Sequence, residues 1–241
     1  MSHQLGNPAH RFTILGEGNS SAQLDENLFL VRASGTELRT LQPEHLVATR
    51  FETTLSLLDN NASEEETEVT LLESRNDPKA LKPSVESTFH AWLLRQPGVN
   101  FVGHTHPIEV NKILCSPAAK LFASRRLFPD EIVCCGPKSL LLDYVNPGAD
   151  LAIAIRNSWD QFIRDNGFTP KILLIKNHGL IAVGETANGV LSATQMANKA
   201  AAVFNGAAIH GKIQFMTPGE VEKIHNRLDE KYRQQQIRKQ T

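Results

Sequence analysis

Two histidines, His104 and His106, lie one residue apart at the end of a short apolar segment, residues 99–106. Side chains on a β-strand alternate between its two faces, so residues two apart point to the same side. The two imidazoles are therefore expected to converge on one point, as metal ligands do. The pair by itself is equally compatible with two surface or hydrogen-bonded histidines.

His178 is a third candidate ligand. It lies between Asn177 and Gly179, at a predicted turn after the apolar segment 171–176, and glycine permits a tight backbone there. Three histidines with an open fourth position are typical of a catalytic zinc site rather than a closed structural one. Neutral imidazole also suits other late first-row ions, so the residues alone do not select the metal.

Glu86 is a candidate catalytic carboxylate. It lies in the first turn of a helix predicted over Ser84–Arg95, with Pro83 before the helix and Ser84 as its N-cap. A helix dipole favours a carboxylate there, and the spacing alone favours simple charge complementarity over catalysis. The other six histidines are expected to be structural or exposed: His3, His10, His45, His90, His210 and His225. Of these, His90 lies one helical turn after Glu86 on the same face.

Two small polar loops are candidate anion-binding segments. Residues 16–21 read GEGNSS before a predicted strand, and residues 33–36 read ASGT directly after it. Such loops offer backbone N–H groups and hydroxyls to an anion, although ordinary turns have the same composition. Ser84, at a helix N-terminus, would complete a phosphate pocket close to Glu86.

The motifs GEGNSS, ASGTEL, KPSVESTFH, GHTHP and KNHGLIAVG follow one another between about Gly16 and Ala202. In type and order they resemble the class II aldolase/adducin family of metal-dependent sugar-phosphate aldolases. The first and third are especially similar to the aldolase half of bifunctional rhamnulose-phosphate aldolase/alcohol dehydrogenases. The resemblance implies that His104, His106 and His178 bind a divalent metal, Zn²⁺ above all, with Co²⁺ or Mn²⁺ as alternatives. It implies that Glu86 is the catalytic acid/base and a fourth ligand in the resting enzyme.

The resemblance also implies a substrate site between subunits. Tyr144 falls where fuculose-phosphate-type aldolases keep a tyrosine that protonates the aldehyde oxygen from the neighbouring subunit of a homotetramer. The residues at the positions of the phosphate cradle are Asn19, Ser34, Gly35 and Ser84. One position departs from the pattern: Val85 stands where the PSSE motif of the fuculose type has its second serine, so one hydroxyl of the cradle is missing.

The elements that would position these residues alternate without a regular βαβ rhythm. Strands are expected at Leu28–Ala33, Val99–His106, once or twice within Ile132–Asp143, and in a hairpin of Lys171–Lys176 with Leu180–Val183. Helices are expected at Glu65–Ser74, Ser84–Arg95, Asp150–Asp165 and Thr186 to about Ile209. This mixture predicts α/β layers on a largely antiparallel sheet. With the resemblance, the expectation is a three-layer α/β/α fold with a mixed central sheet. We expect a single domain over residues 1–241, with its motifs within about 12–209 and a final helix over about 218–237.

The bulk composition excludes several classes of protein. The 241 residues carry 25 basic and 26 acidic side chains, a balance that favours neither nucleic acid nor an acidic membrane as partner. No apolar run approaches the ~18 residues of a membrane span, and residues 1–12 carry no signal-peptide pattern. Three cysteines without a CxxC pair, Cys115, Cys134 and Cys135, favour reduced thiols in a cytoplasmic protein.

The leading functional interpretation is a metal-dependent aldolase, an aldehyde-lyase that cleaves or forms a C–C bond in a ketose 1-phosphate through a metal-stabilised enediolate. The alternatives with the same chemistry are a pentulose-phosphate 4-epimerase, a dehydratase or a decarboxylase. The epimerases typically have aspartate at the position of Glu86, which argues against them. A non-catalytic, adducin-like interaction module is a third alternative, and the retention of all three histidines argues against it.

Overall fold

A seven-stranded sheet forms the middle of the described molecule. The structure is a computed structural model, and it describes residues 1–59, 62–227, 229, 232 and 236. The strand order is β3-β2-β1-β4-β7-β6-β5, and every neighbouring pair is antiparallel except β5 beside β6. The strands are β1 Asn19–Gln23, β2 Leu28–Arg32, β3 Leu46–Arg50, β4 Phe101–Thr105, β5 Leu140–Leu142, β6 Ile172–Ile175 and β7 Gly179–Gly184. The predicted mixed, largely antiparallel sheet is confirmed.

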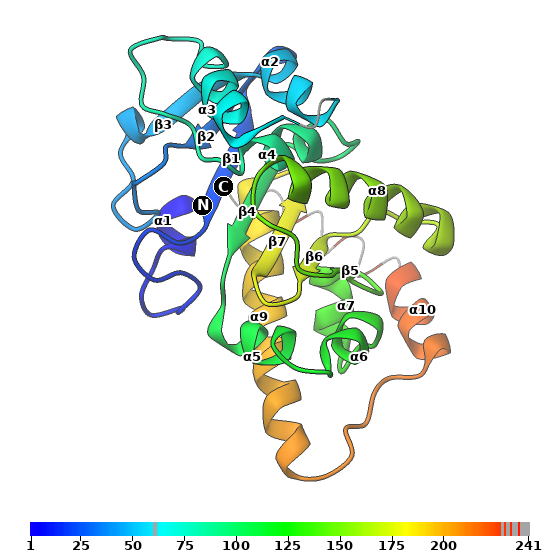
Figure 1. The fold of residues 1–241 in the computed structure, drawn as a ribbon. Helices are drawn as coiled ribbons and strands as arrows, with labels where there is room; N and C mark the ends of the chain where they lie inside the picture. Colours follow the sequence, from blue (N-terminus) through cyan, green and yellow to red (C-terminus); the bar gives the residue numbers. More distant parts are fainter. Residues whose placement is uncertain (60–61, 228, 230–231, 233–235, 237–241) are drawn as a thin grey trace.

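Helices cover both faces of this sheet (Figure 1), which confirms the three-layer α/β/α arrangement. One face carries α2 Phe51–Leu55, η2 Ser56–Leu58, α4 Ser87–Leu94 and α8 Ala149–Asn166, with α3 Glu64–Glu73 against α2. The other carries α5 Ile108–Leu114, α6 Ala119–Ser124, α7 Pro129–Cys135 and α9 Ala187–Ile209. Three further elements lie outside these layers: α1 Ser2–Leu5, η1 Pro43–His45 and α10 Pro218–Asn226. None of the described helices is long and apolar enough to cross a membrane.

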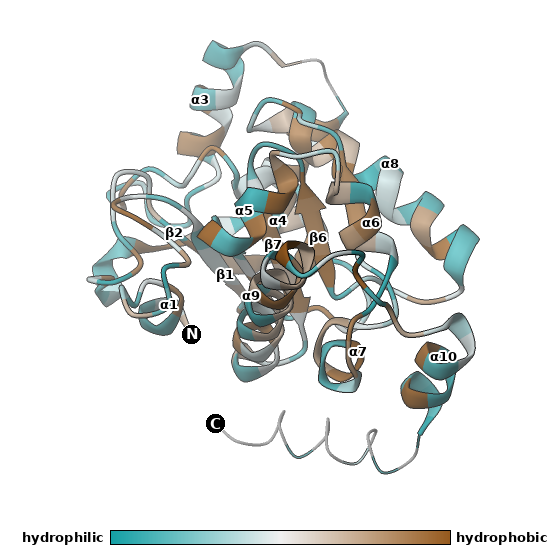
Figure 2. Cartoon of the chain, turned by 90° about the horizontal axis from the view of Figure 1, so that it is seen from below, coloured by the Kyte–Doolittle hydropathy of each residue, from teal (hydrophilic) through white to brown (hydrophobic). Residues whose placement is uncertain are grey.

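Strand β6 is apolar on both faces. On β6, Leu173 and Ile175 pack with the α4 and α8 layer, whereas Ile172 and Leu174 pack with the α5, α7 and α9 layer. Strands buried on both faces read as continuous apolar runs, as this one does. Figure 2 shows β6 in brown between helices whose outer parts include teal, hydrophilic segments.

Several predicted elements are confirmed. The hairpin of β6 and β7 pairs antiparallel, and its turn is Lys176–His178. The helix predicted over Asp150–Asp165 is α8, and the helix predicted over Glu65–Ser74 is α3. The long helix is α9, and Thr186 caps it by accepting a hydrogen bond from the amide of Gly189 at 3.1 Å.

The helix predicted to begin at Ser84 begins instead at Ser87. The reason is that the residues before it continue the sheet: Pro83 bridges Ala33, and the Ser84 amide donates to the carbonyl of Arg32 at 3.3 Å. This hydrogen bond holds Ser84 beside the end of β2. Glu86 is therefore the N-cap residue of α4, not a member of its first turn.

One strand lies within Ile132–Asp143, where one or two were predicted: it is β5 Leu140–Leu142. Residues 132–135 belong instead to α7, because Pro129 at the first position and two acidic residues in the first turn start a helix that buries Ile132 and Val133. The polar loop predicted over residues 16–21 ends at Gly18, since Asn19 already pairs in β1. The described part of the final helix includes α10 Pro218–Asn226, and most of its predicted extension to residue 237 lies outside the described residues.

Candidate metal centre

The three histidines come from two neighbouring strands and one turn. His104 lies on β4, opposite Ile181 of β7. His106 follows β4 by one residue, so the strand predicted to include it ends at Thr105. His178 lies in the turn that enters β7. Because β4 and β7 are hydrogen-bonded neighbours, the end of one and the start of the other meet at the same edge of the sheet.

The three imidazoles converge on one point, as the sequence predicts. Their candidate ligand atoms all lie within 4.8 Å of one another. Nε2 of His104 lies 3.0 Å from Nε2 of His106 and 3.2 Å from Nε2 of His178. Nitrogen ligands of a tetrahedral zinc ion, at about 2.0–2.1 Å from the metal, lie about 3.4 Å apart. The spacing of the three nitrogens therefore fits one metal ion.

The protonation state of the histidines also fits a metal. His104 Nδ1 donates to the carbonyl of Leu180 at 3.0 Å, so its Nε2 carries a lone pair that faces the other two rings. Burial, followed by the neighbouring charge of His178, lowers the pKa of His104 to about 3. Burial, followed by His104, lowers the pKa of His106 to about 4. A nitrogen must be unprotonated to bind a metal ion. The low pKa values of His104 and His106 therefore suit metal binding, and a cation between the rings would accept their lone pairs.

The turn that carries His178 is built differently from the prediction. The residue with positive φ is Asn177, at 56°, and not Gly179. Asparagine tolerates this left-handed conformation better than most residues. Gly179 is required for space instead, because a Cβ there would lie 2.6 Å from Cδ2 of His106 and 2.6 Å from the carbonyl of Thr105.

Glu86 faces the histidines with one oxygen. Its Oε1 lies 3.6 Å from Nε2 of His104 and 3.5 Å from Nε2 of His178. This oxygen is buried and has no hydrogen-bond partner. The other oxygen, Oε2, accepts a hydrogen bond from Nδ2 of Asn19 at 2.6 Å. The carboxylate is thus anchored on one side and available on the side of the candidate metal.

Asn19 and Ser84, two of the predicted cradle residues, meet at this anchor. Asn19 Nδ2 also donates to Oγ of Ser84 at 3.3 Å. The side-chain oxygen of Asn19 contacts Nε2 of His90, and Nδ1 of His90 lies 2.6 Å from Oγ of Ser21. His90 is completely buried. It was predicted to be structural or exposed, and its position one turn after Glu86 was the sequence signal of its closeness to the site.

Arg32 is a second residue that the sequence did not single out. It is only 6% exposed, and its Nε has no hydrogen-bond partner. Its NH1 donates to the carbonyl of Thr36. Burial is the largest influence on the pKa of Arg32 and lowers it, whereas the charge of Glu86 raises it. The predicted cradle residues Ser34 and Gly35 lie in the exposed loop between Arg32 and Thr36.

Tyr144 makes a hydrogen bond to a residue outside the histidine cluster. It follows β5, is 53% exposed, and donates from its hydroxyl to Oδ1 of Asn146 at 3.3 Å. Its predicted catalytic role stays a prediction.

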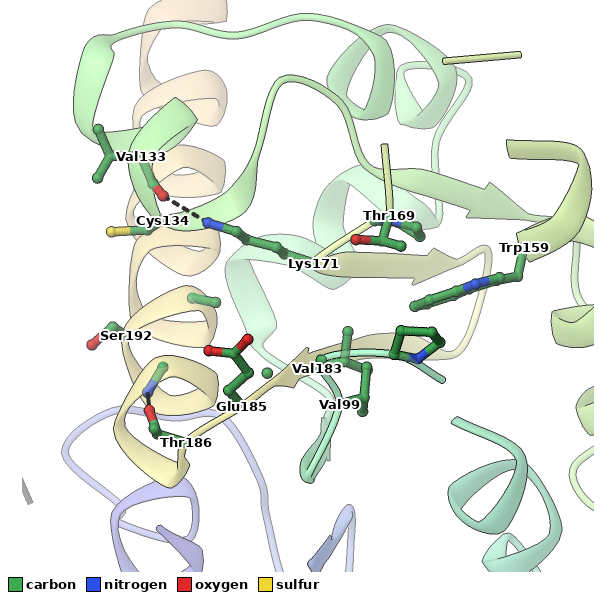
Figure 3. A pocket seen from close by; sticks show the side chains of 16 residues that line it. Val99, Val133, Cys134, Trp159, Thr169, Lys171, Val183, Glu185, Thr186 and Ser192 are labelled. Atoms are coloured by element: carbon green, nitrogen blue, oxygen red, sulfur yellow. Dashed lines mark hydrogen bonds between the residues drawn. The ribbon is translucent and has the colours of Figure 1, made fainter. Parts of the chain in front are cut away.

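A separate cavity of about 240 Å³ lies at the other end of β7 (Figure 3). Val183, Val99 and the indole of Trp159 contribute its apolar walls, and Lys171 lies there with its ammonium donating to the carbonyl of Val133 at 3.0 Å. None of the three candidate metal ligands lines it. This cavity is therefore not part of the histidine site.

The fold and the site together identify the family. Residues 4–204 match the family described as the class II aldolase and adducin N-terminal domain. This chain belongs to that family.

Among known relatives, a 3-oxo-tetronate 4-phosphate decarboxylase of Haemophilus influenzae is 27% identical over 228 residues, which are 93% of this chain and 94% of the relative. A solved L-fuculose 1-phosphate aldolase superposes with a TM-score of 0.69 at 15% identity, covering 96% of this chain and 92% of that one. YgbL of Klebsiella pneumoniae, described as an aldolase/epimerase/decarboxylase, has a TM-score of 0.69 at 18% identity, covering 92% and 93%. These structural likenesses establish the shared fold.

Proposed function

We propose that the protein is a metal-dependent lyase that breaks or forms a C–C bond next to a carbonyl of a sugar phosphate, with a ketose 1-phosphate as substrate of an aldol reaction. The observation that carries the proposal is the unpaired oxygen Oε1 of Glu86, 3.5 Å from Nε2 of His178 and 3.6 Å from Nε2 of His104. It combines a buried carboxylate with three converging imidazoles, which is a suitable set for proton transfer beside a Lewis acid.

His104, His106 and His178 would hold the metal, with Glu86 as a fourth ligand in the resting enzyme. Such an ion, with Zn²⁺ first among the candidates and Co²⁺ or Mn²⁺ as alternatives, supplies electrostatic stabilisation for the negative charge of an enediolate. In aldol cleavage the bond between C3 and C4 breaks, and its electron pair stays on the ketose-derived half as the enediolate. Tyr144 of a neighbouring subunit would accept the proton of the C4 hydroxyl as that oxygen becomes the aldehyde oxygen, and would return it in the addition direction. Glu86 then delivers a proton to C3. This use of Tyr144 requires an oligomer, which we propose to be a homotetramer in the cytoplasm.

The proposed substrate is anionic because of Arg32. A buried charge is normally paired, and the guanidinium of Arg32 has no carboxylate within salt-bridge distance among the described residues. A phosphate bound by Asn19, Ser34, Gly35 and Ser84 would supply the missing acceptor. Arg32 would then offset the hydroxyl that Val85 removes from the cradle, since guanidinium groups bind phosphate strongly.

Decarboxylation is the second candidate, and the relative from Haemophilus influenzae favours it. In a 3-oxo acid the bond to the carboxylate carbon breaks, CO₂ leaves, and the electron pair stays behind as the same kind of enediolate. Glu86 would again return the proton to carbon. The two reactions therefore need the same residues and differ in which group leaves.

A substrate panel separates the two candidates. The metal-loaded protein is incubated with ketose 1-phosphates and dihydroxyacetone phosphate is assayed, while a 3-oxo-4-phosphorylated sugar acid is assayed for CO₂ release. We expect dihydroxyacetone phosphate from at least one ketose 1-phosphate. CO₂ release with no aldol cleavage would replace the aldolase by the decarboxylase, and inactivity in both assays would reject the proposed lyase. A protein that binds no added metal would instead favour an interaction module.

A further inference from the structure

The chain of hydrogen bonds that ends on Glu86 has a fixed direction. Nδ2 of Asn19 must face the carboxylate of Glu86, because an amide N–H donates and a carboxylate oxygen accepts. The carbonyl oxygen Oδ1 of the same amide then faces Nε2 of His90. An oxygen that can only accept requires a proton on Nε2.

The other ring nitrogen of His90 completes the direction. A neutral imidazole protonated at Nε2 has a lone pair at Nδ1, so the hydroxyl of Ser21 is the donor in the 2.6 Å contact. His90 is completely buried, and burial is the largest cause that holds its pKa well below the ordinary value. The direction is therefore Ser21 to His90, His90 to Asn19, and Asn19 to Glu86, with every donor matched to an acceptor.

We infer that His90 is a positioning residue, which as the Nε2–H tautomer holds the amide of Asn19 in one orientation and so anchors Oε2 of Glu86 while Oε1 faces the three histidines. The side chain of His90 hydrogen-bonds to Ser21 and Asn19 and to none of the candidate metal ligands, so it acts through Asn19. Its effect on turnover rests on the proposed role of Glu86, whereas the tautomer does not.

The backbone explains why the side-chain amide of Asn19 reaches both Glu86 and His90. Asn19 is the strand partner of His104, so its side chain lies beside the candidate metal ligands. Without a donor at Nε2 of His90, the amide could rotate by half a turn and turn Oδ1 toward Glu86. Two oxygens would then face each other in a buried place, where an unmatched polar pair is costly. The carboxylate would move from its anchored position.

Two substitutions of His90 separate positioning from packing. The side-chain amide of glutamine reaches about as far as Nε2, and that of asparagine about as far as Nδ1. His90→Gln keeps a donor for Asn19, whereas His90→Asn keeps only the contact with Ser21. Both replace a buried ring by a smaller amide, so their unfolding free energies should fall together. Thr88→Val, at a completely buried position on the same helix, is the control that should leave turnover unchanged.

We expect His90→Gln to keep most of kcat and His90→Asn to lose about 10–100-fold in kcat, with KM changed much less. Equal losses in both variants, in proportion to their stability, would overturn the inference. If His90→Asn does not fold, Ser21→Ala is used in its place, because this substitution removes the donor to Nδ1 of His90. It should lower kcat clearly while changing the unfolding free energy little.

A spectroscopic measurement tests the geometry without turnover. In metal-free protein with ¹⁵N-labelled histidine, the ring of His90 should show the proton–nitrogen correlation pattern of the Nε2–H tautomer, assigned through its loss in His90→Gln. A ring protonated at Nδ1 would reject the inference even if the enzyme is active. The expected tautomer together with an active Glu86→Gln variant would reject the proposed function and leave the geometry intact.

Discussion

Oε1 of Glu86 lies 3.5 Å from Nε2 of His178 and accepts no hydrogen bond, although it is buried. Burying a carboxylate oxygen without a donor is costly, and its neighbour at 3.6 Å, Nε2 of His104, also carries a lone pair because Nδ1 of that ring donates to Leu180. A cation, or a proton that is being transferred, would be a partner for both the carboxylate oxygen and the imidazole nitrogen. Substitutions of Glu86 and of His178 test this contact.

Replacing Glu86 by glutamine should separate catalysis from metal binding. The amide keeps the shape of the carboxylate but cannot take up a proton at the pH of the assay. We expect kcat to fall by about 10²–10⁴-fold, the range of general acid–base catalysis, with metal content nearly unchanged. Steady-state kinetics and elemental analysis of the same preparation measure both. Glu44→Gln, at an exposed position in η1, is the control. Normal turnover in Glu86→Gln would contradict the assignment.

Removing one histidine should release the metal. In His178→Ala two of the three imidazoles remain, and we expect affinity for Zn²⁺ to weaken by more than the about 10–100-fold typical of an outer hydrogen-bond partner. Competition with a chromogenic chelator measures the dissociation constant. His210→Ala alters an exposed histidine at the end of α9 and should bind metal like the unmodified protein. Equal affinity in the two variants would exclude His178 as a ligand.

Arg32 should determine affinity for an anionic substrate. Hydrogen bonds to a charged group contribute about 1.5–3 kcal/mol, so Arg32→Met should raise KM, and the inhibition constant of inorganic phosphate, by about 10–150-fold. The methionine preserves much of the buried aliphatic volume. Arg39→Met, at an exposed site, is the matched control. Unchanged inhibition by phosphate would mean that Arg32 balances Glu86 and does not bind the substrate.

Tyr144 should act across a subunit boundary. Tyr144→Phe removes only the hydroxyl, which is exposed and contacts Asn146 in its own chain. We expect a lower kcat with normal metal content. Mixed oligomers of Tyr144→Phe and Glu86→Gln chains should regain activity, because some sites would combine an intact tyrosine with an intact glutamate. Mixtures no more active than the two separate variants would place the tyrosine outside the neighbouring site.

The metal-free protein should lose stability in mild acid. Burial lowers the pKa of His104 to about 3 and holds that of His90 well below its ordinary value, whereas in an unfolded chain both are near about 6.5. The unfolded chain thus binds protons that the folded chain does not. Stability is complete above about pH 6.5 and falls as the pH drops, by about 1.4 kcal/mol per pH unit for each imidazole.

Urea unfolding at several pH values, above the range in which carboxylates titrate, measures this slope. His104→Asn should reduce the slope by the share of one proton, and His210→Asn should not change it. A flat profile would show that these imidazoles are not neutral and buried in the metal-free fold.

Local pattern was enough to predict the convergence of His104 and His106, because strand alternation fixes the side on which each lies. His178 lies close to His104 because β4 pairs with β7. The two histidines are 74 positions apart in the sequence, and no local pattern predicts a pairing over that distance. Asn19 was placed in a loop because its neighbours are turn-forming residues. Pairing with His104 and the rest of β4 overrides that preference.

The start of α4 was misplaced for a related reason. Pro83 and Ser84 have the sequence of a helix start, but tertiary hydrogen bonds to β2 hold them extended. Arg32 and His90 were not predicted as site residues, since their roles depend on which buried partners surround them.

Gly179 connects the chemistry of this site to its evolution. His106 packs against the bare Cα of this glycine, and one methyl group would lie 2.6 Å from the ring. A single codon change to alanine would therefore press on both the ring of His106 and the carbonyl of Thr105, and so displace a ligand at the end of β4. A gene duplicate could lose its chemistry in one mutational step and survive as a structural component. An enzyme and a non-enzymatic member of such a lineage would then differ, at this site, by one methyl group.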